Sequence, residues 1–109
     1  MLVEFSIIPV GGDTHTSGLL AEALKLVSES GLPYQLTPSG TCIEGAWEDV
    51  MAIVRRCHER VRRDVPHVVT TIKVEDDNGE TGKLRRNVAS VEEKAGVERQ
   101  GGTAGATER

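Results

Sequence analysis

The sequence predicts an α+β domain with the ferredoxin-like arrangement, in which a four-stranded antiparallel sheet carries two helices on one face and is followed by a short C-terminal helix. Three observations support this class. Hydrophobic residues recur with a two-residue period in some segments and with a helical period in others, in the order βαββαβ. The two middle strands are separated only by a tight turn. The chain of 109 residues also has the length of one domain. This order of elements is the split βαβ plan.

The first strand is expected over residues 2–10, and the first helix over the segment that follows GGDTHTSG. Apolar and polar residues alternate in the strand, which is typical of a strand with one buried face. The alternating residues are Val3, Phe5 and Ile7 against Glu4 and Ser6. In the helix, apolar residues recur at helical spacing until Gly31 and Pro33 end the run. These residues are Leu19, Leu20, Ala23, Leu24 and Val27.

The stretch YQLTPSGTCIEG predicts a hairpin with residues 34–37 and 41–44 as its two arms. Pro38 suits a turn because its φ angle is already restricted, and Gly40 is expected to supply a permissive backbone. Polar side chains occur along both arms, where a strand buried on two faces would not carry them. One face of this hairpin is therefore expected to be polar.

The second helix is expected over residues 46–64 and the last strand over residues 67–76. Glu48 and Asp49 fall in the first turn of the helix, where carboxylates oppose the positive end of the helix dipole, and Pro66 ends the helix. The apolar stripe of this helix consists of Val50, Ile53, Val54, Cys57 and Val61. The strand HVVTTIKVED alternates like the first one.

A third, short helix is expected after the polar loop DDNGETG, because four apolar residues form a narrow seam at helical spacing. They are Leu84, Val88, Val91 and Ala95. From residue 99 onward the sequence has no hydrophobic period and is rich in Gly and Thr. We therefore expect one domain over residues 1–98 and a disordered tail over residues 99–109.

Composition and charge exclude several classes of partner. The formal net charge is −4, whereas binding to nucleic acid or an anionic membrane requires an excess of clustered Lys and Arg. No apolar run approaches the ~20 residues that span a bilayer, and the N-terminus lacks the basic region of a signal peptide. Cys42 and Cys57 are too few for a disulfide scaffold and are expected to be reduced thiols. These features predict a cytoplasmic protein.

The two-residue period of the strands assigns a set of polar side chains to the sheet face that the helices leave open. This set comprises Glu4, Ser6, Gln35, Thr37, Cys42, Glu44, Thr71 and Lys73. Hydroxyls, an amide and carboxylates from all four strands suit a hydrated ligand site. They suit equally a polar interface between two sheets or an ordinary solvated face, and the pattern alone leaves these alternatives open.

A family resemblance adds to this pattern. YQLTPSGTCIEG, with VVTTIKVEDD downstream and VEEKAG near the end, resembles the small thiamine-binding family, whose members show a Y-x-L-x-P-x-G-T-x-I-E-G core. The resemblance covers nearly the whole chain up to about Gly96. Two departures stand out, because Trp47 is not typical of the family and NGETGKLRRN replaces the family's usual continuation after EDD. The last helix is therefore expected to pack on the sheet differently from the corresponding helix of the family.

The resemblance implies a ferredoxin-like domain that assembles through its sheets into dimers and tetramers, with a homotetramer formed as a dimer of dimers. It also implies binding of thiamine or its hydroxymethylpyrimidine moiety without catalysis, and no bound cofactor. The ligand-binding candidates under this hypothesis are Tyr34, Thr37, Ser39, Gly40, Thr41, Glu44, Trp47 and Thr71.

The chemistry of the ligand suggests roles for some of these residues. An aminopyrimidine presents an amine donor beside ring-nitrogen acceptors, which a carboxylate such as Glu44 and the Thr hydroxyls can pair. A thiazolium is a fixed cation that an aromatic face such as Trp47 attracts. Each residue also has an ordinary interpretation: Glu44 as a solvated carboxylate or interfacial ion pair, Trp47 as a packing residue, and Tyr34 as a core or rim residue.

No pattern in the sequence supports catalysis or a metal site. His15, His58 and His67 belong to separate segments, and adjacent Cys57 and His58 on a helix do not point the same way. Two hypotheses from different classes therefore remain. The first is a non-catalytic binder of thiamine or its pyrimidine moiety, and the second is an oligomeric interaction or regulatory module whose polar sheet face is an assembly interface.

Overall fold

The computed structural model describes residues 1–11, 16–78 and 82–96. The tail that the sequence predicts to be disordered, residues 99–109, lies outside the described residues. The elements occur in the order β1 (Leu2–Pro9), α1 (Thr16–Glu29), β2 (Tyr34–Thr37), β3 (Gly40–Glu44), α2 (Trp47–Asp64), β4 (Val68–Glu75) and α3 (Lys83–Ala95).

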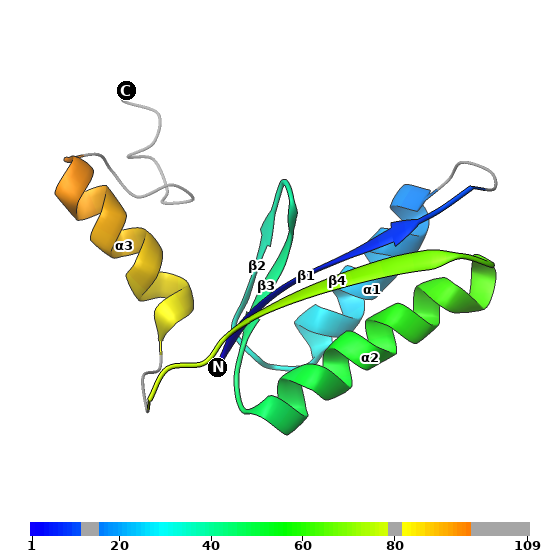
Figure 1. The fold of residues 1–109 in the computed structure, drawn as a ribbon, viewed down its shortest axis with the longest axis horizontal. Coiled ribbons are helices and arrows are strands. Elements are labelled where there is room, and N and C mark those ends of the chain that lie inside the picture. Colours follow the sequence, from blue (N-terminus) through cyan, green and yellow to red (C-terminus); the bar gives the residue numbers. More distant parts are fainter. Residues whose placement is uncertain (12–15, 79–81, 97–109) are drawn as a thin grey trace.

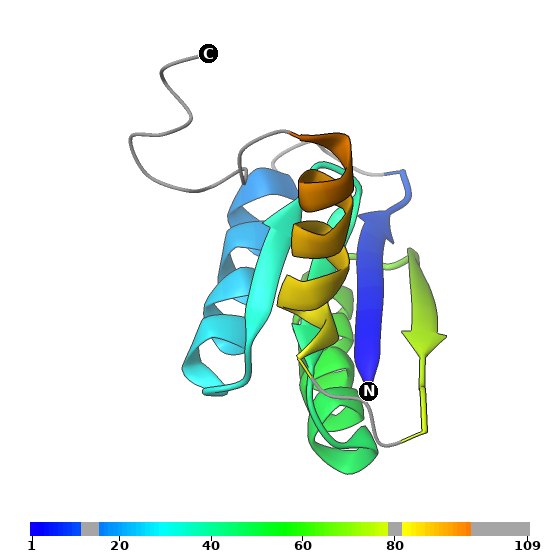
Figure 2. The ribbon, with the colours of Figure 1, turned by 90° about the vertical axis from the view of Figure 1, so that its left-hand side faces the viewer.

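The four strands form one antiparallel sheet in the order β2-β3-β1-β4. Helices α1 and α2 lie side by side on one face of this sheet, while α3 stands on the other side near the β2–β3 hairpin (Figures 1 and 2). The predicted ferredoxin-like arrangement with an additional C-terminal helix is confirmed. Helix α2 begins one residue later than predicted and ends at the predicted residue, whereas α1 begins at Thr16, inside the GGDTHTSG stretch that the sequence predicts to precede it.

The register of the strands assigns each side chain to a face. Val3 lies opposite Ile43 and Val74, so these three residues share the face that α1 and α2 cover. Glu4 lies opposite Cys42 and Lys73, which places the polar set on the open face, as the alternation of the sequence predicts. The buried core is aliphatic apart from one phenylalanine and one cysteine, and consists of Val3, Phe5, Ile7, Ala23, Val27, Ile43, Val50, Ile53, Val54, Cys57 and Val61.

Helix α2 contributes most of the helical part of this core because its apolar residues form one stripe. Its N-cap residue, Ala46, makes no side-chain hydrogen bond, so Glu48 and Asp49 in the first turn supply the negative charge that favours this terminus. The helix ends at Asp64, and its C-cap residue Val65 has the extended backbone that is favoured before a proline. Arg60 joins α2 to α1 through an ion pair with Glu22, at 2.7 Å between Nη2 and Oε1.

Gly40 begins β3, and its role differs from the one that the sequence suggests. Its φ angle is not positive, so the turn does not require the conformational freedom of glycine. Instead, a Cβ atom at this position would lie 2.7 Å from the carbonyl oxygen of Phe5. Glycine is needed here because the hairpin tip approaches the backbone of β1 closely.

We therefore predict that Gly40→Ala lowers the free energy of unfolding by about 1–3 kcal/mol, because the added methyl group forces β1 and β3 apart. Gly18→Ala is the matched control, since a Cβ there meets nothing within 4 Å and alanine favours the helix by roughly 0.5–1 kcal/mol. Urea titration followed by circular dichroism measures both changes. Equal effects of the two substitutions would contradict the steric explanation.

Candidate ligand-binding site

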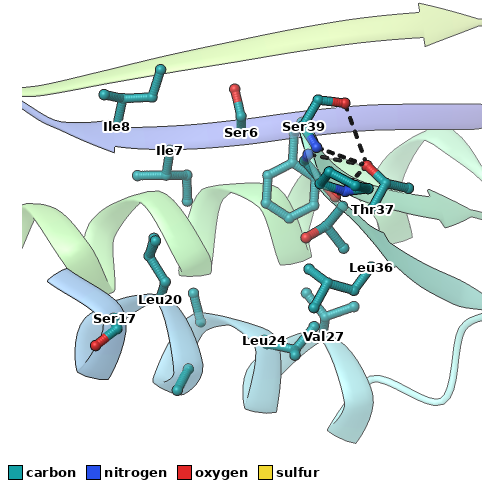
Figure 3. A pocket seen from close by; sticks show the side chains of 16 residues that line it. Ser6, Ile7, Ile8, Ser17, Leu20, Leu24, Val27, Leu36, Thr37 and Ser39 are labelled. Carbon is teal, nitrogen blue, oxygen red and sulfur yellow. Dashed lines mark hydrogen bonds between the residues drawn. The ribbon is translucent and has the colours of Figure 1, made fainter.

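A pocket of about 650 Å³ lies between α1, the second half of β1 and the tip of the β2–β3 hairpin. Figure 3 shows Leu20 and Leu24 of α1 facing Ile7 of β1 and Leu36 of β2 across it. These side chains make most of the lining apolar. We call this space the hairpin pocket.

Hydroxyl groups provide the polar part of the hairpin pocket. They come from Thr37, Ser39 and Thr41 of the hairpin and from Ser17 of α1, whereas the side chain of Ser6 points to the open face of the sheet (Figure 3). None of the sixteen residues that line it carries a charged side chain. The pocket therefore suits a flat, largely apolar group with a few hydrogen-bonding atoms, and it offers no ion pair inside.

The hydroxyl of Thr37 is used by the hairpin itself. Its Oγ1 accepts hydrogen bonds from the backbone N–H of Gly40 at 3.1 Å and of Ser39 at 3.3 Å, and donates to the carbonyl of Gly40 at 2.9 Å. Ser39 Oγ donates to the carboxylate of Glu4 at 3.3 Å, so a negative charge lies at the rim of the pocket. The turn is thus held in one shape by its own polar side chains.

The structure divides the predicted ligand-binding residues into two groups. Thr37, Ser39, Gly40 and Thr41 line the hairpin pocket together. The other four predicted residues, Tyr34, Glu44, Trp47 and Thr71, are not among its lining.

The four residues outside the pocket lie at different places on the sheet and on α2. The alternation in β4 puts Thr71 on the open face, whereas Tyr34 lies opposite Ile43 and so points to the helix side. Trp47, in the first turn of α2, is 52% exposed, so its indole remains accessible. The ligand roles of all eight residues stay predictions.

Glu44 has a structural partner that the sequence did not suggest. Its side chain is only 8% exposed, and Oε2 accepts a hydrogen bond at 2.7 Å from the backbone N–H of Lys83, the first residue of α3. Of the interpretations left open for Glu44, the solvated carboxylate is therefore wrong, because α3 docks over the end of β3. Glu44 satisfies one of the N–H groups that a helix leaves unpaired at its start.

The side chain of Lys83 completes this joint between β3, β4 and α3. Its Nζ forms ion pairs with Glu75 and Asp77, each at 2.9 Å. The hydrogen bond from Lys83 lowers the pKa of Asp77, and the hydrogen bonds to Glu75 and Asp77 raise the pKa of Lys83. We call Glu44, Glu75, Asp77 and Lys83 the α3 anchor.

The apolar wall of the hairpin pocket was not identified from the sequence. The helical spacing predicts Leu20 and Leu24 in the apolar face of the helix, but Leu20 is 39% exposed and both face the pocket. The available signal was the width of the stripe on α1, where Leu19 and Leu20 are adjacent and cannot both point into the core.

Neither cysteine is activated for nucleophilic chemistry. Burial and the nearby Glu4 raise the pKa of Cys42. Burial raises the pKa of Cys57 to about 11, and its Sγ donates to the carbonyl of Ala23 at 3.4 Å. Reactive cysteines have lowered pKa values, so these thiols fit a structural role.

Two further findings concern only the part of the chain that the structure describes. In it, no three His, Cys, Asp or Glu side chains are grouped so that they could hold a metal ion. None of its helices combines the length and the apolar character needed to cross a bilayer.

Comparison with known protein families and sequences gives consistent matches. The family model described as thiamine-binding protein matches residues 3–92. The UPF0045 protein Mb1933 of Mycobacterium bovis is 40% identical over 93 residues, which covers 84% of this chain and 91% of that protein. The UPF0045 protein YqgV of Bacillus subtilis is 30% identical over 96 residues, with 83% and 92% covered.

Solved structures share the fold. The MJ1052 protein of Methanocaldococcus jannaschii superimposes with a TM-score of 0.76 at 24% identity, covering 84% of this chain and 95% of that one. A Thermotoga maritima protein assigned provisionally to thiamine biosynthesis or salvage gives a TM-score of 0.71 at 21% identity, with 83% and 96% covered. At these identities the likeness concerns the fold.

The α3 anchor leads to a first prediction for this region. Glu44→Ala removes the acceptor of the Lys83 N–H, and a lost helix cap costs about 0.5–2 kcal/mol. We expect faster hydrogen exchange in α3 while the amides of β1 keep their protection. Glu48→Ala, which removes an exposed carboxylate in the first turn of α2, is the control. Unchanged exchange in α3 of the Glu44 variant would show that the anchor does not hold this helix.

A second prediction concerns pH. Because the pKa of Asp77 is lowered from its ordinary value of 3.8, its ion pair stabilises the folded anchor above that pH and the stabilisation is lost as the pH falls. The raised pKa of Lys83 keeps this residue charged throughout the acid range. Exchange protection factors of α3 should therefore drop below pH ~4. In Lys83→Met, Asp77 has no ion pair to lose, so the part of the drop due to the ion pair between Lys83 and Asp77 should disappear.

Proposed function

Because the chain belongs to the thiamine-binding protein family, we propose that it binds thiamine or the hydroxymethylpyrimidine moiety of thiamine and does not transform it. The observation that carries this proposal is the hairpin pocket, which is lined by the residues of the family core motif from Leu36 to Thr41. Its volume lies in the range of ordinary small-molecule sites, about 300–1,000 Å³.

The lining of the pocket matches the pyrimidine end of the ligand. A flat ring can lie between Leu20 and Leu24 on one side and Ile7 on the other, where it loses contact with water. Its amine and ring nitrogens need partners when buried, and an unpaired one costs about 1–3 kcal/mol. The hydroxyls of Ser39 and Thr41 lie at the pocket end where these atoms would be placed.

The thiazolium end carries a fixed positive charge and fits outside the apolar lining. Burying this cation among uncharged side chains would be costly. The rim provides a counter-charge instead, since the Glu4 carboxylate accepts a hydrogen bond from Ser39 at 3.3 Å. We therefore place the pyrimidine inside the pocket and the thiazolium at its mouth beside Glu4.

We propose that the other four residues predicted from the sequence contact the ligand from outside the hairpin pocket. Glu44, Trp47, Tyr34 and Thr71 lie outside the hairpin pocket, so any contact they make involves a different part of the ligand or a different site. We also propose that the chain works in the cytosol as a homotetramer, a dimer of dimers. The free thiols of Cys42 and Cys57 support a reducing compartment.

An interaction or regulatory module is the second candidate function. The observation in its favour is the open sheet face, where Ile8 is 52% exposed and Val69 is 45% exposed among the polar side chains. Exposed apolar groups of this kind mark interaction surfaces when they are contiguous. In this alternative the face serves assembly, and a small ligand in the pocket is incidental.

Isothermal titration with thiamine, thiamine pyrophosphate and hydroxymethylpyrimidine tests the proposal. We expect saturable binding at micromolar or lower concentration. Ala21→Leu should weaken it at least tenfold, or about 1.4 kcal/mol, because the larger side chain fills the pocket. Lys25→Leu introduces the same side chain on the exposed side of α1 and should leave binding unchanged.

Two other outcomes would contradict the proposal in different ways. If Glu44→Gln weakens binding and Ala21→Leu does not, the ligand lies at the base of β3 and the pocket assignment is wrong. If none of the three compounds gives heat while light scattering shows an intact oligomer, the interaction module is the better description.

A further inference from the structure

The hairpin pocket has two walls that the rest of the domain holds with unequal strength. On one side, the Thr37 hydroxyl fixes the turn through hydrogen bonds to its backbone, and Gly40 packs on the carbonyl of Phe5. The opposite wall is α1, which supplies Ser17 and Leu20 from its first residues. The attachment of α1 to the domain therefore decides how firmly the second wall is held.

Helix α1 is attached to the core through its second half. None of residues 17–22 is buried, and Leu19 is the one among them that is partly buried. From Ala23 onward the attachment is firm, because Ala23 and Val27 belong to the core and the Ala23 carbonyl accepts a hydrogen bond from Cys57 Sγ at 3.4 Å. Segments with few buried contacts open locally at a small cost in free energy. We call residues 16–21 the α1 start.

The sequence of the α1 start also weakens the helix itself. It contains Gly18, and glycine loses more conformational freedom on entering a helix than any other residue. The first turn of α1 carries no acidic side chain, whereas the first turn of α2 carries Glu48 and Asp49, which interact favourably with the helix dipole. Val50 in the same part of α2 is fully buried. Of the two helices that cover the sheet, α1 therefore has the less stable beginning.

Two leucines on opposite sides of the pocket favour the wound form of the α1 start when a ligand is present. Leu20 of α1 and Leu36 of β2 face each other across the pocket and are 39% and 60% exposed (Figure 3). A flat apolar group in the pocket would remove part of both side chains from water, which is favourable. An unwound α1 start cannot offer the Leu20 contact. The ligand thus distinguishes the two forms, as any ligand-driven shift requires.

We propose that the α1 start is a movable wall of the hairpin pocket, which unwinds to admit or release the ligand and winds closed over it, and that Gly18 sets how readily it opens. The ion pair between Glu22 and Arg60 marks where the fixed part of α1 begins. Gly18 is a positioning residue, because it is absent from the pocket lining and a Cβ atom there meets nothing within 4 Å. The identity of the ligand rests on the proposed function, whereas the opening is a property of the free chain.

Hydrogen exchange of the free chain tests the opening without a ligand. The amide of each helical residue bonds to the carbonyl four residues earlier, so amides 20–22 report on the α1 start and amides 51–53 on the same positions of α2. We expect protection factors of amides 20–22 to be at least tenfold lower. Gly18→Ala should raise them at least twofold and leave amides 51–53 unchanged. Equal protection of the two helix beginnings would overturn the proposal.

Thiamine is the probe for closure. We expect saturating thiamine to raise the protection of amides 20–22 at least tenfold. Because release passes through the unwound form, Gly18→Ala should lower the dissociation rate constant at least twofold, as measured by analysis of line shapes in a nuclear magnetic resonance titration. Ser28→Ala is the matched control, since it adds helix propensity at an exposed position of α1 beyond Ala23 and should leave the rate unchanged.

The outcomes separate this proposal from the proposed function. If thiamine binds but dissociates from Gly18→Ala as fast as from the wild type, or if Ser28→Ala slows dissociation equally, the wall does not move as proposed. If thiamine does not bind, the proposed function fails, while the exchange of the free chain still decides whether the α1 start opens.

Discussion

The close contact between the hairpin tip and β1 determines where the functional features of this domain lie. Gly40 packs so tightly on the Phe5 carbonyl that no larger residue fits without displacement. This contact continues the register of β3 against the central strand β1. It also holds the hydroxyls of the turn above the apolar side chains of α1, which creates a pocket with a polar end and apolar walls. If the hairpin tip lay farther from β1, its hydroxyl groups would not lie beside the apolar side chains of α1.

The other end of β3 serves a different purpose. Ile43 points into the core and Glu44 points to the open face, as the alternation of a strand requires. Because α3 covers this end, the carboxylate is withdrawn from water and caps the helix through Lys83. One short strand therefore holds both the pocket residues and the attachment of the C-terminal helix. Glu44 thus has a structural role in holding α3, and this role is compatible with a further role in binding.

Much of the fold could be predicted because it rests on local periodicity. The alternation in β1, β3 and β4 correctly assigned Glu4, Cys42 and Lys73 to one face, because the buried residues of a strand determine which residues point the other way. The burial of Glu44 could not be predicted, because it depends on where α3 docks. The pocket wall was missed for a similar reason: Leu20 and Leu24 have the same pattern whether they meet the core or a cavity. The turn pattern predicts that Gly40 is needed for its backbone freedom, whereas the actual constraint is the carbonyl of Phe5, a residue far away in the sequence.

The hairpin pocket and the α3 anchor lie at opposite ends of β3, and this geometry decides how they can influence each other. The pocket is lined by Gly40 and Thr41 at the start of the strand, whereas Glu44 at its end accepts the hydrogen bond from Lys83. Strand β3 pairs with β1, whose residues Phe5 and Ile7 line the pocket and also belong to the buried core. Any coupling between ligand binding and the position of α3 must therefore pass through these two strands, which the surrounding core holds rigidly.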